Sequence, residues 1–341
     1  MEVIGAGPVG LWVAKKAADA GLKVRVHEAR PLIGEPDHCT GLLSNNIDRI
    51  VEPEVVLHYI NGARFFAGKE EMLIERKKVA KVIDRVEFNK QLCEEAMASG
   101  ARVHTGRRVL WRDFQGDVVA ADGVMGSTRT DFGQKLRFLP AMQYDLNERP
   151  EEDFVELWFE PWNPDFFIWV VPRGNHVRVG TASRDLRPLQ AFIGRRFGRF
   201  RPVAKHVGLV VTSGPVKKTC FEAGDRRVFL VGDAAGQVKP TTGGGVYTGM
   251  LCAEKLVEAL VGGNPQGYER RWRSALGREF LLQRLARRLM LRNPPAFVRF
   301  LRRSRLHLER QGDMDYQSRA VLRLFFPAFM WLLESLSPQK F

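Results

Sequence analysis

A glycine-rich turn lies close to the N-terminus, between a short apolar segment and a helical pattern. Residues 2–4 predict a strand, the run 5–10 (Gly-Ala-Gly-Pro-Val-Gly) follows at once, and apolar residues then recur at helical spacing. In this arrangement Gly5 permits the tight turn, Gly7 lets the backbone approach a phosphate, and Gly10 lets helix and strand pack closely. The helix N-terminus offers free N–H groups and a partial positive charge. The chain is therefore expected to begin as a Rossmann-type unit that binds a dinucleotide pyrophosphate.

A second strand is expected over residues 23–27, and it ends at Glu28, which lies 18 residues after Gly10. An acidic side chain at this position accepts hydrogen bonds from the adenosine ribose hydroxyls, and its charge disfavours a 2′-phosphate. A glycine-rich turn alone also fits an ordinary α/β domain. Strand, glycines, helix, strand and acid in this order favour binding of a dinucleotide.

A second glycine-rich region lies in the C-terminal half. Residues 228–233 (Val-Phe-Leu-Val-Gly-Asp) predict a buried strand that ends at Asp233, placed to accept the hydroxyls of a ribityl chain. The run 241–245 (Thr-Thr-Gly-Gly-Gly) opens a helix whose first N–H groups can face the flavin O2 and N1, where negative charge develops on reduction. The Asp122-Gly123 turn resembles one found in flavin hydroxylase folds, although a simple β-turn fits it equally well. Together the two glycine-rich regions predict FAD rather than NAD.

Further cofactor contacts are expected between these regions. A helix is expected to begin with residues 84–88 and to end near residue 100, and Arg85 at its start is a candidate partner of the pyrophosphate, or of the loop that wraps it. Strands are expected over 101–104 and 108–111, and the backbone at Val109 is a candidate contact for the adenine. The candidate cofactor-binding residues are Gly5, Gly7, Val9, Gly10, Glu28, Cys39, Thr40, Leu42, Arg85, Val109, Asp233, Gly244, Gly245 and Val246.

The cofactor-binding elements are split along the chain, over residues 1–128 and 220–265. Between them, residues 129–219 carry short β-branched or aromatic segments separated by turns, with a hairpin turn at 173–176, and predict an antiparallel sheet that walls a substrate cavity. Residues 266–341 look helical. The predicted fold is α/β: a Rossmann-type FAD-binding domain of the flavin hydroxylase type, an inserted antiparallel β-sheet substrate domain and a helical C-terminal region. The expected strands of the inserted sheet are 139–145, 153–159, 166–171, 177–182 and 208–212.

The charge of the chain is uneven. Residues 269–310 carry most of the formal net charge of +14, with thirteen arginines against three acidic residues. Three interpretations fit: a solvated helical face whose arginines pair with acids elsewhere, a nucleic-acid surface, or a surface for an anionic membrane. No nucleic-acid fold or aromatic stacking motif accompanies the arginines, so we expect no nucleic-acid partner. Apolar residues interleave the arginines at helical spacing and favour the membrane: Leu281, Leu282, Leu285, Leu289 and Met290.

Residues 320–336 are apolar and aromatic but interrupted by charges and a proline, which suits an interfacial or cavity-covering segment, or buried core, better than a membrane span. No uninterrupted apolar run is long enough to cross a bilayer. The first strand begins at the initiator methionine, so we expect no signal peptide. The four cysteines show no paired spacing, so we expect neither disulfides nor a metal site. We therefore expect a cytoplasmic protein, peripheral on the inner face of the cell membrane.

Three runs carry a resemblance to a known family: 232–245 (Gly-Asp-Ala-Ala-Gly-Gln-Val-Lys-Pro-Thr-Thr-Gly-Gly-Gly), 38–44 (His-Cys-Thr-Gly-Leu-Leu-Ser) and 164–172 (Pro-Asp-Phe-Phe-Ile-Trp-Val-Val-Pro). They resemble, in turn, the flavin motif, the Cys-Gly motif and the Pro-x-x-Tyr-x-Trp-x-Phe-Pro motif of archaeal geranylgeranyl reductases, including the digeranylgeranylglycerophospholipid reductases. The resemblance covers nearly all of residues 1–290.

The chain departs from that family's pattern at three positions. Phe167 stands where the family usually has Tyr and Val171 where it has Phe, so a hydroxyl is lost from the cavity wall. Thr40 separates Cys39 from Gly41. These departures bear on the substrate and on proton delivery, and they leave the flavin motifs intact.

The resemblance implies an FAD-dependent oxidoreductase that saturates C=C bonds of isoprenoid chains, as in archaeal membrane lipids. Its implied partners are an isoprenoid lipid, an electron donor such as NAD(P)H or ferredoxin, and an anionic membrane surface contacted through residues 269–310. A prenyl chain needs a long apolar tunnel. The candidate substrate contacts are Trp158, Phe167, Trp169 and Pro172, although the two tryptophans fit a plain sheet core as well.

Saturation of an unpolarised alkene also needs a proton. Cys39 and His38 lie on the loop expected to pass the flavin and are the candidate catalytic residues. The alternatives are a small packed residue for Cys39 and a capping or surface role for His38. Two other functions fit the same sequence: a monooxygenase of this fold that uses NAD(P)H and oxygen, and a non-catalytic flavoprotein that binds a membrane or a partner through its arginines.

Overall fold

The computed structural model describes residues 1–316. The first glycine-rich turn joins β1 (Glu2–Ile4) to α1 (Pro8–Asp19), which has proline at its first position, where no N–H is needed. β1 lies in a six-stranded sheet, parallel to β2 (Arg25–His27) on one side and to β7 (Asp117–Ala120) on the other. The strand order therefore reverses at β1, and the carboxyl ends of these strands form the edge at which α/β folds bind nucleotides.

Strands from distant parts of the sequence complete this sheet. Its order is β13-β14-β7-β1-β2-β6; β13 runs antiparallel to β14, and the other neighbours are parallel. Residues 220–230 thus join the N-terminal strands, and the predicted Rossmann-type unit is confirmed. The added strands are β6 (Arg102–His104), β13 (Cys220–Ala223) and β14 (Arg226–Leu230).

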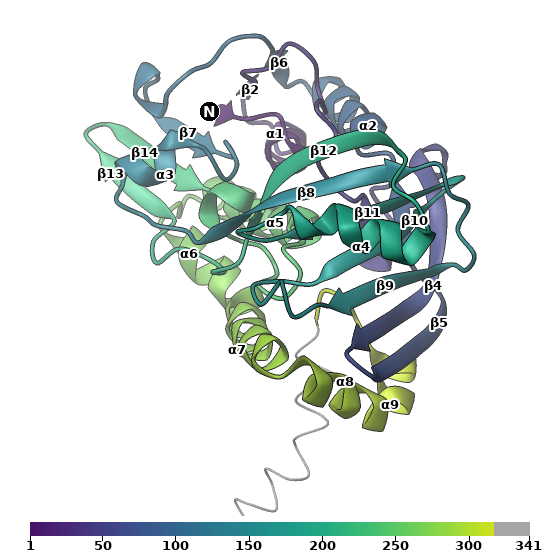
Figure 1. Ribbon diagram of the computed structural model, residues 1–341. Coiled ribbons are helices and arrows are strands. Elements are labelled where there is room, and N and C mark those ends of the chain that lie inside the picture. Colours follow the sequence, from purple (N-terminus) through teal and green to yellow (C-terminus); the bar gives the residue numbers. More distant parts are fainter. Residues whose placement is uncertain (317–341) are drawn as a thin grey trace, which may run out of the picture.

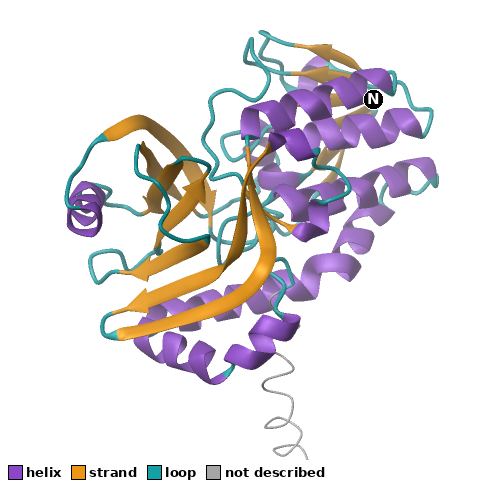
Figure 2. Ribbon diagram, turned by 90° about the vertical axis from the view of Figure 1, so that its right-hand side faces the viewer, coloured by secondary structure: helices purple, strands orange, loops and turns teal. Residues whose placement is uncertain are grey.

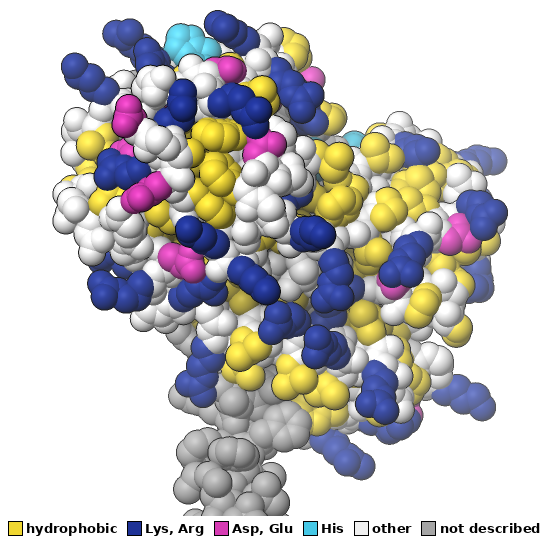
Figure 3. Space-filling view, turned by 90° about the vertical axis from the view of Figure 1, so that its left-hand side faces the viewer, with side chains coloured by type: hydrophobic (Ala, Val, Ile, Leu, Met, Phe, Trp, Pro, Cys, Tyr) yellow, Lys and Arg dark blue, Asp and Glu magenta, His cyan; other side chains and the backbone are white. Residues whose placement is uncertain are grey.

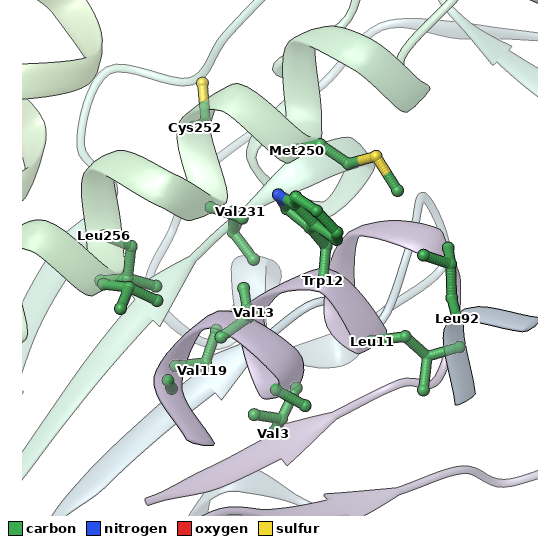
Figure 4. Packing of buried hydrophobic residues seen from close by; sticks show 14 of the residues in the cluster. Val3, Leu11, Trp12, Val13, Leu92, Val119, Val231, Met250, Cys252 and Leu256 are labelled. Atoms are coloured by element: carbon green, nitrogen blue, oxygen red, sulfur yellow. The ribbon is translucent and has the colours of Figure 1, made fainter. Parts of the chain in front are cut away.

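Helix α1 packs against α2 (Arg85–Ala98) and α5 (Val246–Val261), which follow the two halves of the cofactor-binding region. Figure 4 shows Trp12 of α1 beside Met250 of α5, with Leu92 of α2 close to the same helix. These side chains are buried in one hydrophobic core. The core therefore joins the two glycine-rich turns, which are more than two hundred residues apart, in a single body.

A second sheet of eight strands lies beside the first, in the order β12-β8-β11-β10-β9-β4-β5-β3 (Figures 1 and 2). Its neighbours are antiparallel except for β4 and β9. The β10–β11 hairpin turns at Gly174, whose φ of 61° favours glycine, within the predicted turn 173–176. The strands from the predicted substrate domain are β8 (Phe138–Leu146), β9 (Phe154–Phe159), β10 (Ile168–Arg173), β11 (His176–Ala182) and β12 (Pro202–Val211).

The second sheet is larger than the sequence predicts. Residues 42–83, which were expected within the FAD-binding domain, supply β3 (Leu42–Ser44), β4 (Val56–Ala67) and β5 (Glu70–Ile83). The apolar pattern does not predict the long β4–β5 hairpin, because the charged residues 75–78 lie within β5 and are exposed. The boundary between the two structural units is therefore not at residue 128 alone.

The strand expected over residues 108–111 does not form. The chain there is extended and then enters a 3₁₀ turn, η3 (Trp111–Asp113). The reason is local: the carboxylate of Asp113 accepts the N–H of Leu110 at 2.8 Å and so fixes a turn instead of a ladder.

The C-terminal region is helical over its described part, as predicted. Helix α8 packs against β4 and β5, and α9 packs against β5, so these helices cover one end of the second sheet (Figures 1 and 2). The apolar segment 320–336 lies outside the described residues. Within residues 1–316, no helix has the length and apolar character needed to span a membrane. The remaining elements are η1 (Asn45–Ile47), η2 (Pro53–Val55), α3 (Ser127–Asp131), α4 (Pro188–Phe197), η4 (Gly232–Ala235), α6 (Gly267–Trp272), the π-helical η5 (Arg273–Gly277), α7 (Arg278–Arg292), α8 (Pro294–Arg303) and α9 (Arg305–Gln311).

Candidate active site

The glycines of the first glycine-rich turn have different surroundings: Gly5 and Gly10 are closely packed, and Gly7 faces open space. A Cβ on Gly5 would lie 2.4 Å from the carbonyl oxygen of Ala121, and a Cβ on Gly10 would lie 2.0 Å from that of Gly5. A Cβ on Gly7 would meet no atom of the described chain within 4 Å. Gly5 and Gly10 are therefore required by the packing of strand and helix. The space at Gly7 fits a pyrophosphate at the N-terminus of α1.

Glu28 follows β2, and its carboxylate is held against this turn. Oε2 accepts the N–H of Ala6 at 2.8 Å, and Oε1 accepts the N–H of Arg30 at 3.0 Å. A carboxylate has about four acceptor positions. The group is thus fixed in place and still able to accept the hydroxyls of an adenosine ribose.

Arg85 and Asp233 are ionisable residues near the two glycine-rich turns, and their side chains make few hydrogen bonds within residues 1–316. Nη1 of Arg85 donates to Asn89 at 2.6 Å, while its Nε is buried and unpartnered among the described residues. The protein around Asp233 desolvates its carboxyl and raises the pKa to about 6, an effect that the charge of Arg85 opposes. No hydrogen bond within residues 1–316 lowers that pKa. A cation and an acid in this condition fit a phosphate and the ribityl hydroxyls of FAD.

The second glycine-rich turn packs on Asp233. A Cβ on Gly245 would lie 2.7 Å from Oδ1 of Asp233, and a Cβ on Gly244 would lie 2.9 Å from Cε of Lys239. Gly245 is the N-cap of α5, and no side chain of residues 1–316 caps this helix. The first N–H groups of α5, from Val246 onward, are therefore free to bind a partly negative group such as the flavin pyrimidine edge.

Lys239 of the same turn is joined to the end of the described chain by a buried ion pair. Its Nζ lies 2.6 Å from Oδ1 of Asp315. The hydroxyl of Ser44 and the amide of Asn46 donate to the other carboxylate oxygen. Burial raises the pKa of Asp315, but the charge of Lys239 and these hydrogen bonds outweigh it and hold the pKa below its ordinary value. The ion pair fixes residues 313–316 beside the second glycine-rich turn.

All of these groups border one cavity of about 1750 Å³. Ordinary small-molecule sites occupy roughly 300–1,000 Å³, so this cavity has room for a cofactor together with a second ligand. Every residue that the sequence predicts as a cofactor contact lines it: Gly5, Gly7, Val9, Gly10, Glu28, Cys39, Thr40, Leu42, Arg85, Val109, Asp233, Gly244, Gly245 and Val246.

Away from the two glycine-rich turns, the cavity wall is apolar. It is formed by one face of the second sheet together with α7 and α8. Phe167 and Trp169, two of the predicted substrate contacts, lie on this wall and are buried. Sequence reasoning missed its contributions from β4 and the C-terminal helices, because they come from segments far apart in the chain. The additional apolar wall residues include Phe65, Leu157, Leu285, Leu289, Phe297 and Phe300.

The other two predicted substrate contacts, Trp158 and Pro172, do not line the cavity. Successive side chains of a strand point to opposite faces of the sheet. Since Leu157 and Val171 line the cavity, their neighbours Trp158 and Pro172 face the other way. Trp158 packs there against Phe192 of α4, with ring centroids 5.5 Å apart. The aromatic character of Trp158 indicates a core position, as the alternative interpretation allowed.

The loop with the two candidate catalytic residues also lines the cavity. Nδ1 of His38 lies 2.8 Å from the carbonyl oxygen of Pro36 and therefore carries the ring hydrogen. His38 is exposed to the solvent that fills the cavity mouth, and partial desolvation by the surrounding protein lowers its pKa, although this hydrogen bond opposes the shift. The sulfur of Cys39 accepts the N–H of Gly41 at 3.5 Å. Both residues are at the site, and their catalytic roles remain predictions.

Arg178 of β11 holds this loop in place. Its side chain is only 1% exposed; it donates to the carbonyl of Cys39, to Asp37 at 3.0 Å, and through two nitrogens to Asp145 at 2.6 and 2.7 Å. Burial raises the pKa of both carboxyls, but the charge and hydrogen bonds of Arg178 outweigh it and lower them below their ordinary values. Sequence reasoning missed this cluster because its members lie 33 and 141 residues apart, outside any motif.

Comparison with known proteins agrees with this geometry. No family model matches the chain. In sequence it is 29% identical to a digeranylgeranylglycerophospholipid reductase of Methanothrix thermoacetophila over 98% of each chain, and 28% identical to one of Methanocaldococcus jannaschii over 85% of each.

Solved structures show the same fold. A geranylgeranyl bacteriochlorophyll reductase-like protein of Thermoplasma acidophilum aligns over 98% of each chain with a TM-score of 0.78 and 22% identity. A flavin-dependent brominase aligns over 88% of this chain and 89% of its own, with a TM-score of 0.69 and 15% identity. The predicted fold class is confirmed. The chain thus resembles archaeal digeranylgeranylglycerophospholipid reductases in sequence over nearly its whole length, and Rossmann-type flavoenzymes in fold.

Proposed function

We propose that this protein is an FAD-dependent reductase that saturates the C=C bonds of geranylgeranyl chains in archaeal membrane glycerophospholipids. The observation that carries the proposal is a continuous cavity, in which the groups that fit FAD and a long apolar wall border the same space. Sequence similarity to digeranylgeranylglycerophospholipid reductases along the chain supports the same substrate class.

FAD would be held by both glycine-rich turns. Gly7 and the N-terminus of α1 would take the pyrophosphate, Glu28 the ribose, Asp233 the ribityl chain, and the start of α5 at Val246 the flavin ring. When bound and reduced, FAD would supply the hydride. The apolar wall would exclude water and hold the prenyl chain, whose burial stabilises the complex by about 0.8 kcal/mol per CH₂.

We also propose that the protein works as a peripheral protein on the inner face of the cell membrane. Along α7, Leu281, Leu285 and Leu289 are spaced by four residues and are 56%, 51% and 55% exposed. Leu285 and Leu289 also border the cavity. An exposed apolar ridge at the opening of an apolar cavity is the arrangement that a substrate embedded in lipid needs.

The arginines support the membrane proposal in part. Five of the thirteen pair with acidic side chains, which fits the solvated-face interpretation, and Arg287 is buried against two carbonyls. The other seven make no ion pair within residues 1–316; near an anionic leaflet each is worth about 1 kcal/mol. Figure 3, which views the side of the molecule where α6 and α7 lie, shows basic side chains in excess of acidic ones with apolar side chains between them. The seven are Arg270, Arg278, Arg284, Arg288, Arg292, Arg303 and Arg310.

The reaction is tested by anaerobic flavin reoxidation. The FAD-loaded protein is reduced with dithionite, which replaces the physiological NAD(P)H or ferredoxin, and a geranylgeranylated glycerophospholipid is added. We expect the oxidised flavin absorbance to return without oxygen, and not to return with the fully saturated lipid as control. Reoxidation only after oxygen is admitted, with oxygen found in the product, would establish the monooxygenase instead.

A further inference from the structure

One row of residues crosses the cavity face of the second sheet. His206 of β12 pairs with Gln143 of β8, and Gln143 pairs with Gly180 of β11. Gly180 pairs in turn with Trp169 of β10. Residues paired across neighbouring strands lie on the same face, and the three with side chains all line the cavity. The row therefore has a titratable imidazole at one end and an indole at the other.

The absence of a side chain at Gly180 allows Trp169 and Gln143 to contact each other across β11. A Cβ on Gly180 would lie 2.4 Å from Cβ of Gln143 and 2.7 Å from the ring of Trp169. Because Gly180 has no Cβ, the indole of Trp169 lies close to β11 and donates its N–H to Oε1 of Gln143 at 3.3 Å. Gln143 is 3% exposed, and its Nε2 has no partner among the described residues. The wall next to His206 is therefore polar, unlike the wall beyond Trp169.

His206 is anchored by an acid through one ring nitrogen. Its Nε2 lies 2.9 Å from Oδ2 of Asp145 and 3.2 Å from Nη2 of Arg178. The two hydrogens of that Nη2 are already directed at Asp145 and Asp37. Nε2 therefore carries its own hydrogen and donates it to Asp145. Nδ1 is the remaining nitrogen, and it makes no hydrogen bond within residues 1–316.

Other titratable groups of the cavity are less suited to release a proton. The ring hydrogen of His38 is engaged with the carbonyl of Pro36. Asp37 and Asp145 are ionised, because Arg178 lowers their pKa values despite their burial. Burial raises the pKa of Tyr247 far above its ordinary value. Cys39 is a competing candidate, and so are the carboxyls of Asp122 and Asp233, whose pKa values are raised by burial.

We propose that His206 is a further catalytic residue, which delivers from Nδ1 the proton that completes the saturation; this inference rests on the proposed function. Reduction of C=C forms two C–H bonds. One uses the hydride pair supplied by reduced FAD, and the other uses the π electrons of the alkene and the proton of His206. FAD ends oxidised, and His206, left neutral, regains its proton from water. Asp145 is a positioning residue, which orients the ring and stabilises its charged form.

Single-turnover reoxidation tests this role in three variants. H206Q keeps an amide donor near the position of Nε2 and so the bond to Asp145, while H206A leaves space for added imidazole. We expect H206Q and H206A to slow reoxidation by about 100-fold or more, and imidazole to restore part of the rate of H206A. The control H104Q is expected to keep the wild-type rate within a few-fold, because His104 is exposed on β6 outside the cavity. Wild-type rates in H206Q, or no rescue of H206A by imidazole, would overturn the proposal.

A second measurement does not depend on turnover. In ¹⁵N-histidine-labelled protein, with the pH raised until the ring signals show a neutral imidazole and with the signal of His206 assigned from H206Q, we expect the hydrogen on Nε2 and a bare Nδ1. The opposite tautomer would contradict the geometry, whatever the activity. If the wild type fails to turn over the geranylgeranyl lipid while this tautomer is observed, the proposed function fails and the placement of His206 stands.

Discussion

Gly7 and Gly10 belong to one motif and have opposite surroundings, so their substitutions separate folding from cofactor binding. A Cβ on Gly10 would meet a backbone oxygen at 2.0 Å, whereas a Cβ on Gly7 would meet open space. We expect Gly10→Ala to lower the free energy of unfolding of the FAD-free protein by about 1–3 kcal/mol. Gly7→Ala should unfold as the wild type does, yet retain little FAD after gel filtration. Wild-type FAD content in Gly7→Ala would show that the pyrophosphate does not lie there.

The Arg178 cluster makes stability depend on pH. The pKa values of Asp37 and Asp145 are lowered in the folded protein, so their contribution is complete above the unfolded pKa near 3.9 and is lost as pH falls below it. Arg178→Met would leave the partly buried Asp145 without its arginine and Asp37 with Arg173 alone, and should cost about 3–5 kcal/mol at pH 7.

The cost of Arg178→Met should be smaller at pH 4, because carboxyls that have lost the cation are protonated more readily. Urea unfolding of wild type and variant at the two pH values measures the difference, with the exposed ion-pair variant Arg187→Met as control. An equal loss at pH 7 and pH 4 would mean that Arg178 acts by packing and not by charge.

Among single residues, the cofactor contacts are the ones that a sequence can predict. Gly5, Glu28 and Asp233 each follow a strand within a contiguous motif, so their spacing alone places them. His206, Arg178 and Asp145 meet only across strands, at separations of 28 to 61 residues, and no local pattern marks them.

At the level of elements, the sequence predicts the helices and strands whose apolar residues recur at regular spacing. The β1–α1–β2 unit and the hairpin of β10 and β11 have regular apolar patterns and turn glycines, and both form as predicted. The β4–β5 hairpin was not predicted because its charged stretch faces solvent. The side of the sheet on which Trp158 lies depends on the pairing of β9 with its neighbouring strands, which the sequence of β9 alone does not give.

Helix α7 is the element expected to contact the membrane. Leu285→Glu, in the middle of its exposed ridge, would remove an apolar contact and add a charge that anionic lipid repels. We expect this variant to bind sedimented anionic liposomes at least several-fold more weakly than the wild type, whose own binding should fall at high salt. Met97→Glu is the matched control, since Met97 is 55% exposed on α2 and lies outside the cavity. Salt-independent binding, or equal loss in both variants, would exclude α7 as the contact.

The whole molecule brings two kinds of lining together around one cavity. The six-stranded sheet presents charged and glycine-rich groups, the eight-stranded sheet presents an apolar wall, and the C-terminal helices close the cavity near the exposed ridge of α7. A prenyl chain that enters beside Leu285 and Leu289 would reach the flavin without crossing water. Neither sheet alone provides such a site.

The mass of the product tests the central claim most directly. Dithionite-reduced, FAD-loaded protein is incubated without oxygen with a geranylgeranylated glycerophospholipid, and the extracted lipid is analysed by mass spectrometry. The account predicts a gain of two hydrogens for each flavin reoxidised, and a loss of that product in Trp169→Asp, which places a charge on the apolar wall. An unchanged lipid from protein whose flavin is fully reduced would contradict the account.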